Sequence, residues 1–349
     1  MQWPRERVAA IGTLREFLMN RIEFLQKGIS RRDRVLEIGP YFNPIAPKAG
    51  GYRTTTLDVF AADVLRKKAV TDPNIPQERV AEIEDVDLIG SASDLADLTR
   101  VRYGEDHCYD WILSSHNIEH IPNPIRFLQQ CSAVLRPRGV LRLAVPDKRF
   151  CFDHFRPLSD VSELLQAFHE NRMQPTEYQI FREESLQSAP GPRGIGWTPA
   201  RRNLSLYREW FGVNGRVPTE YIDTHCWAFT PESFELIILD LVAFGLVDLE
   251  IDSISNAFGC EFFVDLRRPA KPVEICEDEY YAAREWLLCR CIDGTSANCE
   301  RPKSVRFIPD ATEKMFRGEV QKRSVRQRVL REARRLLRQL KGLARTDAA

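Results

Sequence analysis

The sequence contains no hydrophobic segment long enough to cross a membrane. No uninterrupted apolar run in its 349 residues approaches the roughly 20 that span a bilayer. The first residues also lack the apolar core of a secretory signal, because charged side chains interrupt every short apolar stretch, namely Arg5, Glu6, Arg7, Arg15 and Glu16. We therefore expect a cytoplasmic protein.

Cysteine does not follow the pattern of a disulfide-stabilised protein. Nine is an odd number, and a chain of 349 residues can bury a core without covalent cross-links. Cys289, Cys291 and Cys299 lie close together, but their spacing is not a common zinc-ligand pattern and no histidine is nearby. We expect reduced thiols and no bound metal.

The net charge of the chain is zero, although each of its two parts is charged. From Lys314 to Arg345 there are twelve basic and two acidic residues, a net charge of +10, so the remainder carries −10. We expect residues 312–349 to form a basic amphipathic helical tail. Such a helix contacts an anionic membrane surface, a protein or nucleic acid. An acidic body without a recognised RNA-binding module disfavours nucleic acid, and leaves contact with the inner membrane face, with a partner protein or with the chain's own body.

The rest of the chain alternates between strand-like and helix-like segments. Residues 1–29 are expected to form an N-terminal helix that stops at Gly28. Short apolar runs then predict strands, separated by helical stretches, at 34–38, 54–59, 87–89, 109–113 and 140–145. Parallel strands need crossover helices of this kind, so the pattern predicts an α/β fold with a parallel sheet.

The alternation is interrupted after the fifth strand. Residues 148–226 are rich in proline, arginine and aromatic side chains, and predict a partly helical insertion that covers the substrate. A helix is expected to begin at Thr230, followed by two strands that end near Arg267. Residues 268–311 form an extension to which the sequence assigns no structure.

Two acids follow the first two strands in a pattern typical of nucleotide-type pockets. The first strand leads into Glu37-Ile-Gly39, and Asp58 ends the second strand 21 residues after Glu37. A carboxylate at that place can accept hydrogen bonds from both ribose hydroxyls, although it could equally cap the next helix. The turn lacks GxGxxG, which disfavours a nicotinamide-dependent dehydrogenase.

Downstream segments resemble a known family. The run from Tyr109 to Pro124, with Ser-Ser-His-Asn-Ile-Glu-His after a strand, and Val134-Leu-Arg-Pro-Arg-Gly139 before the next strand, are similar to class I S-adenosylmethionine-dependent methyltransferases of the small-molecule type. The resemblance covers residues 30–267. Narrower motifs resemble bacterial methyltransferases found with glycosyltransferases of surface-polysaccharide pathways: Gly39-Pro40 with Asn43-Pro-Ile-Ala-Pro47, Val145–Pro157 and Gly259–Phe263.

The resemblance implies a Rossmann-like sheet of seven strands with a reversed last hairpin, and S-adenosylmethionine as cofactor. It also implies a set of cofactor contacts. The methionine moiety would lie against Glu37, Gly39 and Asn43, and the ribose would lie against Asp58. The adenine would lie against the loop that contains Ser91 and Asp94. The sulfonium would lie under Ser114, Ser115 and His116. Tyr41 and Asn43 stand where the family more often has glycine, and Ser91 where it has an acid.

Methyl transfer to a hydroxyl benefits from a nearby base. The candidates are His116, Asp147, Asp153 and His154, with His225 as a further histidine. Asp147 ends the fifth strand, at the sheet edge where open α/β sheets bind ligands. As an alternative, Asp153, His154 and Arg156 would form a salt-bridged hinge of the insertion, and His225 would be a packed aromatic neighbour.

The segment His116-Asn-Ile-Glu-His120 also matches the HxxEH string of zinc peptidases. That motif requires a helix, which Pro122 and Pro124 disfavour here. We therefore expect no metal, and expect Glu119 and His120 to orient a loop. The functional hypothesis is methylation of an oxygen on a saccharide or other hydroxylated acceptor; the alternatives are N- or O-methylation of a small metabolite, and a non-catalytic binding protein recruited through its tail.

Overall fold

The computed structural model describes residues 21–73, 75–104, 108–191, 196–213, 215–217 and 222–293. The chain divides into a unit of residues 1–307 and a unit of residues 308–349, and only the first contains described residues. The predicted basic tail therefore lies outside the described residues, as do residues 1–20 of the predicted N-terminal helix. That helix is described from Arg21 to Gln26, and it ends before Gly28, whose φ of +84° places it in the left-handed region.

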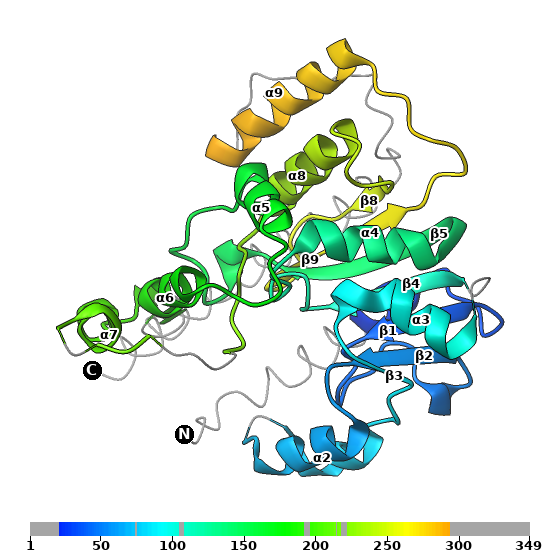
Figure 1. Cartoon of the computed structure of the whole chain (residues 1–349), viewed down its shortest axis with the longest axis horizontal. Coiled ribbons are helices and arrows are strands. Elements are labelled where there is room, and N and C mark those ends of the chain that lie inside the picture. Colours follow the sequence, from blue (N-terminus) through cyan, green and yellow to red (C-terminus); the bar gives the residue numbers. More distant parts are fainter. Residues whose placement is uncertain are drawn as a thin grey trace, which may run out of the picture. The chain divides into compact units, whose positions relative to one another are not determined.

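A seven-stranded sheet forms the centre of the fold, in the order β3-β2-β1-β4-β5-β9-β8 (Figure 1). The first five strands are parallel, whereas β9 is antiparallel to both β5 and β8. This confirms the predicted Rossmann-like sheet with a reversed last hairpin. The strands are β1 (Arg34–Ile38), β2 (Arg53–Asp58), β3 (Leu88–Ile89), β4 (Tyr109–Ser115), β5 (Leu135–Pro146), β8 (Glu250–Ile254) and β9 (Glu261–Arg267).

The buried sequences of the central strands explain their position. Four of the five residues of β1 are buried, and β9 buries six of seven, because helices cover both faces of a sheet of this kind. Helices α3 and α4 lie side by side in Figure 1. The crossover helices are α2 (Ala62–Thr71), α3 (Leu95–Tyr103), α4 (Pro124–Val134) and α8 (Pro231–Ala243), with short 3-10 turns η2 (Lys48–Gly50), η3 (Gln77–Glu82) and η4 (Ala92–Asp94).

One boundary differs from the prediction. The fifth strand was expected to begin at residue 140, but β5 already begins at Leu135 and carries residues 137–139 as an irregularity in its pairing with β4. Arg138 has a φ of +68°, and a Cβ on Gly139 would lie 2.9 Å from the carbonyl oxygen of Arg136. These residues therefore form a bulge inside the strand rather than a break before it.

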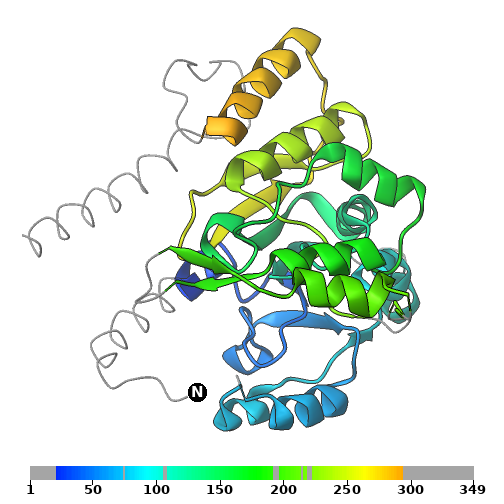
Figure 2. The same ribbon diagram turned by 90° about the vertical axis from the view of Figure 1, so that its left-hand side faces the viewer.

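The insertion between β5 and α8 contains the helices drawn in green in Figure 2. The insertion is partly helical, as predicted, and its helices are α5, α6 and α7. Ile180, Leu206 and Trp210 give α6 and α7 a small hydrophobic cluster of their own. The elements are η5 (Lys148–Phe150), α5 (Val161–His169), α6 (Glu177–Leu186), β6 (Ser188–Pro190), β7 (Trp197–Pro199) and α7 (Asn203–Phe211).

The two ends of the insertion are bonded to each other. The amide of Lys148 donates to the carbonyl of Phe229 at 2.9 Å, and that of Ser159 donates to Ala228 at 3.0 Å. We call these paired ends, residues 147–160 and 224–229, the neck. It leads into α8, which begins as predicted at Thr230, where a reciprocal capping box with Ser233 satisfies the first amides.

The extension after β9, to which the sequence assigned no structure, contains α9 (Glu277–Asp293). This helix packs on α8 through a cluster of Leu239, Ala283 and Leu287. Eight cysteines of the described residues are unpaired thiols. Within the described part of the chain, no helix is long and apolar enough to cross a membrane.

Candidate active site

The carboxyl ends of β1 and β2 form an open turn beside an acid. Gly39 follows β1 with a φ of +63°, is exposed, and has no atom within 4 Å of the position that a Cβ would take. Tyr41 has a φ of +44°, so it adopts the backbone region that favours the glycine more common at this place. A ligand can approach the backbone of this turn closely, which fits the methionine end of S-adenosylmethionine. Asn43 lies in the same turn, half-buried.

Glu37 is buried next to this turn and accepts hydrogen bonds from the backbone of the loop that follows it. Only 2% of it is exposed, and its two oxygens accept hydrogen bonds from the amides of Ile45 at 2.5 Å and Ala46 at 2.9 Å. Burial raises the pKa of Glu37 from 4.5 to about 7, against the lowering effect of those two amides. Glu37 therefore folds the 39–47 loop back onto β1, and its predicted contact with the cofactor remains a proposal.

Asp58 stands at the end of β2, as predicted. One carboxylate oxygen accepts a hydrogen bond from the amide of Phe60 at 3.1 Å, and the residue is half-buried. Burial raises the pKa of this carboxyl, while the Phe60 and Val59 amides and the charge of Lys68 lower it. Asp58 thus presents a carboxylate at the end of β2, where the ribose contact was predicted, and that contact remains a proposal.

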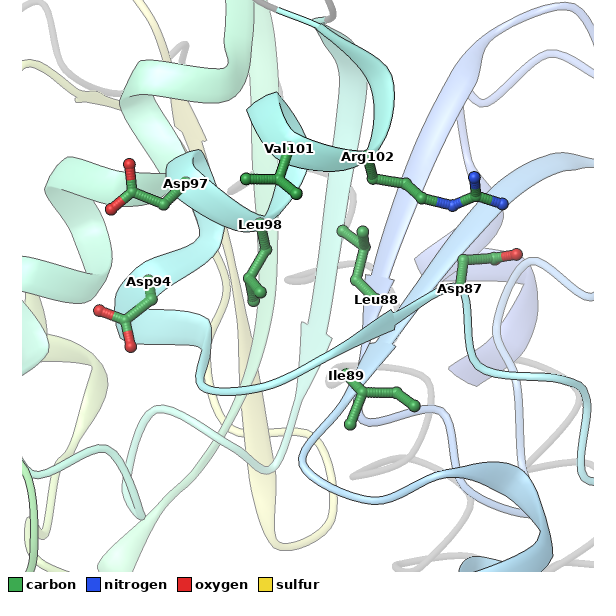
Figure 3. A pocket seen from close by; sticks show the side chains of 8 residues that line it. All are labelled: Asp87, Leu88, Ile89, Asp94, Asp97, Leu98, Val101 and Arg102. Carbon is green, nitrogen blue, oxygen red and sulfur yellow. The ribbon is translucent and has the colours of Figure 1, made fainter.

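The predicted adenine loop is well ordered by its own contacts. Ser91 begins η4 and its hydroxyl accepts from the amide of Ser93, while Asp94 pairs with Arg126 at 2.7 Å. A hollow of about 370 Å³ lies beside it, at the outer edge of the sheet (Figure 3). Of the residues that line it, Asp94 is the one that was predicted to contact the cofactor. The lining residues come from β3, η4, α3 and their neighbours: Asp87, Leu88, Ile89, Asp94, Asp97, Leu98, Val101 and Arg102.

The end of β4 presents three consecutive residues with different surroundings. Ser114 is buried and accepts a hydrogen bond from Asn117, and Ser115 accepts one from Arg21 at 2.6 Å. His116 is exposed and has a φ of +50°. Partial desolvation by the surrounding protein lowers the pKa of His116, but the hydrogen bond to Glu261 and the charge of Glu119 outweigh it, so that the pKa is raised.

Two of the predicted bases are already engaged. Asp147 is fully buried, and its two oxygens accept hydrogen bonds from the Arg149 amide and guanidinium at 2.6 to 3.2 Å. Asp153 is 1% exposed and binds His225 at 2.6 Å and Arg156 at 2.8 Å. Its pKa is lowered, because these two partners outweigh the effect of burial. Both acids are thus held by partners within the neck, and their predicted role as base remains a proposal.

His154 is oriented differently. Its Nδ1 lies 3.0 Å from the carbonyl oxygen of Arg149, and a carbonyl only accepts, so Nδ1 carries the proton. The lone pair is then on Nε2. The ring stacks on Trp197 of β7, with centroids 5.3 Å apart at 17°. Asp153 and His154, adjacent in the sequence, thus differ in role, and the predicted salt-bridged hinge consists of Asp153, Arg156 and His225.

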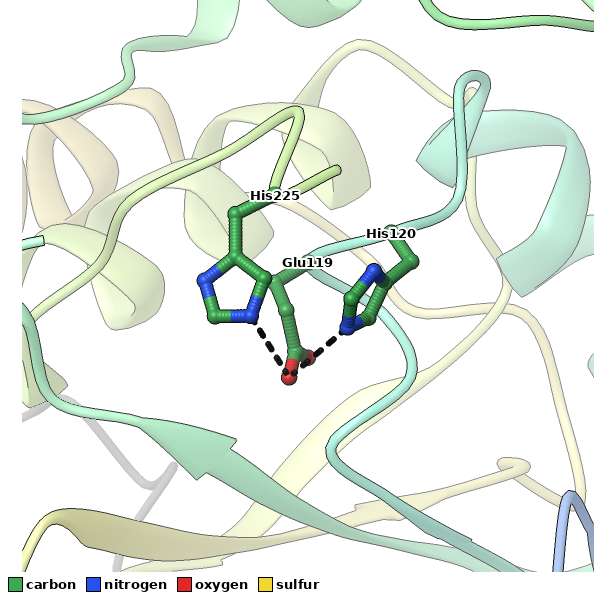
Figure 4. A group of neighbouring side chains, drawn as sticks. All are labelled: Glu119, His120 and His225. Atoms are coloured by element: carbon green, nitrogen blue, oxygen red, sulfur yellow. Dashed lines mark ion pairs between the residues drawn. The ribbon is translucent and has the colours of Figure 1, made fainter. Parts of the chain in front are cut away.

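The loop after β4 meets the neck in a group of ionisable side chains (Figure 4). Residues 118–120 form a turn, which confirms that the HxxEH string does not lie on a helix. Glu119 is 1% exposed, with nitrogens of His120 and His225 each 3.9 Å from its Oε1. His225 is therefore not merely a packed aromatic neighbour.

Two residues of the site were missed by the sequence reasoning. Arg21 and Glu261 form a buried pair, with Nε to Oε1 at 2.5 Å, and Glu261 also binds His116 Nε2 at 2.9 Å. Glu261 lies in residues 259–263, one of the segments that carried the family resemblance. That resemblance was the one feature of the sequence that pointed to Glu261. The pairing joins residues 240 positions apart, and no local pattern reveals such a contact.

Comparison with known proteins places the chain in a family. The family model for a methyltransferase domain matches residues 11–238, well over half of the chain. Among solved structures, S-adenosylmethionine-dependent methyltransferases from Methanosarcina mazei (16% identity, 71% of this chain and 98% of that one, TM-score 0.37) and Mesorhizobium loti (12%, 71% and 98%, TM-score 0.36) are similar. No curated protein matches. The chain belongs to the methyltransferase domain family and is an S-adenosylmethionine-dependent methyltransferase.

Proposed function

We propose that this enzyme methylates an oxygen of a saccharide or another hydroxylated acceptor. The observation that carries the proposal is the tautomer of His154, which leaves an unprotonated Nε2 beyond the carboxyl end of β5. An amine acceptor can give up a proton to water, whereas a hydroxyl needs a base at the moment of transfer. The sequence resemblance to methyltransferases of polysaccharide pathways supports a saccharide as the hydroxyl carrier.

The cofactor would be held along the ends of β1, β2, η4 and β4. Gly39 and Asn43 would accommodate the methionine end, Asp58 the ribose, and the Ser91–Asp94 loop the adenine. Ser114 and Ser115 are bonded to protein partners, so they would shape the wall of the pocket through their backbone. When bound, S-adenosylmethionine supplies a methyl group already activated by its sulfonium.

The protein then has to position the acceptor and remove one proton. Positioning contributes most, because the reaction is a direct transfer between two held groups. His154 Nε2 would accept the hydroxyl proton, and the Arg149 carbonyl would stabilise the resulting charged ring through Nδ1–H. Phe155 packs edge-on against the His154 ring, is 41% exposed, and would offer apolar surface to the carbon skeleton of the acceptor.

The first experiment is calorimetric titration with S-adenosylhomocysteine, followed by an acceptor screen with methyl-labelled cofactor. The screen starts with nucleotide- and lipid-linked sugars and includes amine-bearing metabolites. Transfer to a sugar hydroxyl, with the label on oxygen, is the expected result. A label on nitrogen would replace the proposal by small-metabolite N-methylation, and cofactor binding without transfer to any acceptor would favour the non-catalytic alternative.

A further inference from the structure

Glu119, His120 and His225 form a compact group, which we call the Glu–His triad. One ligand atom from each, a carboxylate oxygen and two ring nitrogens, lies within 4.8 Å of the other two. Figure 4 shows both imidazoles directed at the carboxylate. Glu119 and His120 come from the turn after β4, and His225 comes from the neck, so the fold brings together segments more than 100 residues apart.

The carboxylate of Glu119 accepts no hydrogen bond within the described part of the chain, and only imidazole nitrogens at 3.7 to 3.9 Å approach it. Both of its oxygens are buried, and neither has a hydrogen-bond partner among the described residues. A buried carboxylate without partners is costly, since desolvation of a charge amounts to several kcal/mol. Such an atom in a folded protein calls for a partner of opposite charge.

The surrounding histidines have each used their outer nitrogen on another carboxylate. His225 Nδ1 donates to Asp153 at 2.6 Å, and His120 Nδ1 lies 2.9 Å from Asp223 Oδ1. The hydrogen bond to Asp153 holds a proton on Nδ1 of His225, which leaves the lone pair of its Nε2 directed at Glu119. A carboxylate behind a histidine is the arrangement that orients metal-bound imidazoles in proteins.

The distances are those of ligands around a common ion rather than of hydrogen bonds. Nitrogen–oxygen hydrogen bonds have lengths of about 2.7 to 3.2 Å. Two ligands about 2.0 to 2.1 Å from a tetrahedral zinc ion lie about 3.4 Å from each other. The Nε2 atoms of His120 and His225 are each 3.9 Å from Glu119 Oε1, so each of these two pairs would close by about half an ångström. All three ligand atoms already lie within 4.8 Å of one another.

We propose that the Glu–His triad binds a divalent transition metal ion, Zn²⁺ in the first instance. Two imidazoles and one carboxylate suit Zn²⁺, whereas Mg²⁺ and Ca²⁺ prefer oxygen ligands. Three protein ligands leave a fourth position for a further ligand, as in catalytic zinc sites. A third histidine lies near the triad: His116 Nδ1 is 3.7 Å from Glu119 Oε1, and its side chain is 39% exposed.

The backbone already holds the two contributing segments together. The amide of Trp227 donates to the carbonyl of Glu119 at 3.2 Å, and the Trp227 indole donates to the carbonyl of Ile121 at 2.6 Å. These bonds fix the turn against the neck on both sides of the ligands. The triad is therefore preorganised, and a metal would need little rearrangement to bind.

The test is titration of the chelator-stripped full chain with Zn²⁺ against a chromophoric competitor. We compare the protein with Glu119→Gln and His225→Gln, and with His169→Gln, a change at an exposed histidine outside the triad. The triad variants should lose one bound equivalent or bind it at least a hundredfold more weakly, while the control matches the unchanged protein. Comparison is necessary because the nine cysteines can bind Zn²⁺ independently.

Two further measurements keep the outcome clear. Asp153→Asn leaves the triad intact but removes the carboxylate behind His225, and should weaken binding about 10- to 100-fold. Co²⁺ in the unchanged protein should give a visible spectrum of nitrogen and oxygen ligands without the charge-transfer band of thiolates. Equal Zn²⁺ stoichiometry and affinity in all variants, or a thiolate spectrum alone, would overturn the proposal. None of these readouts depends on methyl transfer. Failure of the metal proposal can therefore be distinguished from failure of the proposed function.

Discussion

Arg142 and Asp265 lie opposite each other in β5 and β9 and are joined by two hydrogen bonds of 2.7 Å. Their side chains are 5% and 12% exposed. The same guanidinium donates to the carbonyls of Leu25 at 3.1 Å and Lys27 at 2.7 Å, where the N-terminal helix ends. A buried cation thus joins the antiparallel end of the sheet to a helix C-terminus, where positive charge is favourable.

Breaking this pair should destabilise the fold. Asp265→Ala leaves the Arg142 guanidinium buried with one fewer acceptor, and removal of one partner of a buried pair costs about 3 to 5 kcal/mol. The free energy of unfolding, measured by urea denaturation, should fall by that amount. The control is Asp97→Ala, whose pair with Arg100 is solvent-exposed and should change stability by less than about 1 kcal/mol. Similar effects of both changes would contradict a special role for the buried pair.

Asp58→Ala should weaken cofactor binding. One hydrogen bond to a charged group is worth about 1.5 to 3 kcal/mol, so the affinity for S-adenosylhomocysteine should fall at least about tenfold. Calorimetric titration measures the change. Asp63→Ala on the exposed side of α2 removes an acid of the same type and should leave binding unchanged. If the Asp58 variant binds as tightly as the unchanged protein, the ribose assignment is wrong.

His154→Gln should lower turnover and spare cofactor binding. A positioned base contributes about 10² to 10⁴ in rate, so kcat should fall within that range while the affinity for S-adenosylhomocysteine stays the same. The measurement uses the acceptor found in the screen, with His169→Gln as the matched control. Normal turnover in the His154 variant would rule out its role as base.

Stability should depend on pH through Glu37. Its pKa is raised to about 7 in the folded protein from 4.5, so between these values the folded state keeps a proton that the unfolded state releases. The stabilisation is complete below the unfolded pKa and is lost as the pH rises through 7, by up to about 1.4 kcal/mol per pH unit. Urea denaturation of the cofactor-free protein from pH 5 to 8 should show a shallower decline for Glu37→Gln. Identical slopes would contradict the shift.

Local patterns predicted much of the sheet. Residues 34–38 were assigned to a strand with the bounds that the structure shows, because a short apolar run that ends at a glycine is typical of a strand buried on both faces. The capping pattern at Thr230 placed the start of α8 for a similar reason. The start of β5 at Leu135 was missed, because the proline and glycine in residues 137–139 are equally typical of a turn and of a bulge inside a strand.

The site was less predictable, because its important contacts join distant segments. The acid at Asp58 could be located from spacing alone, whereas the partners of Asp147, His116 and His225 could not. The prediction that the HxxEH string does not lie on a helix was correct. The same prediction considered only the five residues of the string as possible members of the group. His225 enters the group from the neck, and only the folded topology brings it there.

The neck has a consequence for how this enzyme could change its substrate. Both ends of the insertion are bonded to each other, and His154 and His225 lie on those ends rather than on the helices between them. The segment α5 to α7 could therefore be exchanged between homologues as a cassette, provided that it keeps an aromatic side chain at Trp197 to stack on His154. New acceptor preferences would then arise by recombination of the outer segment, while both histidines stay on the neck.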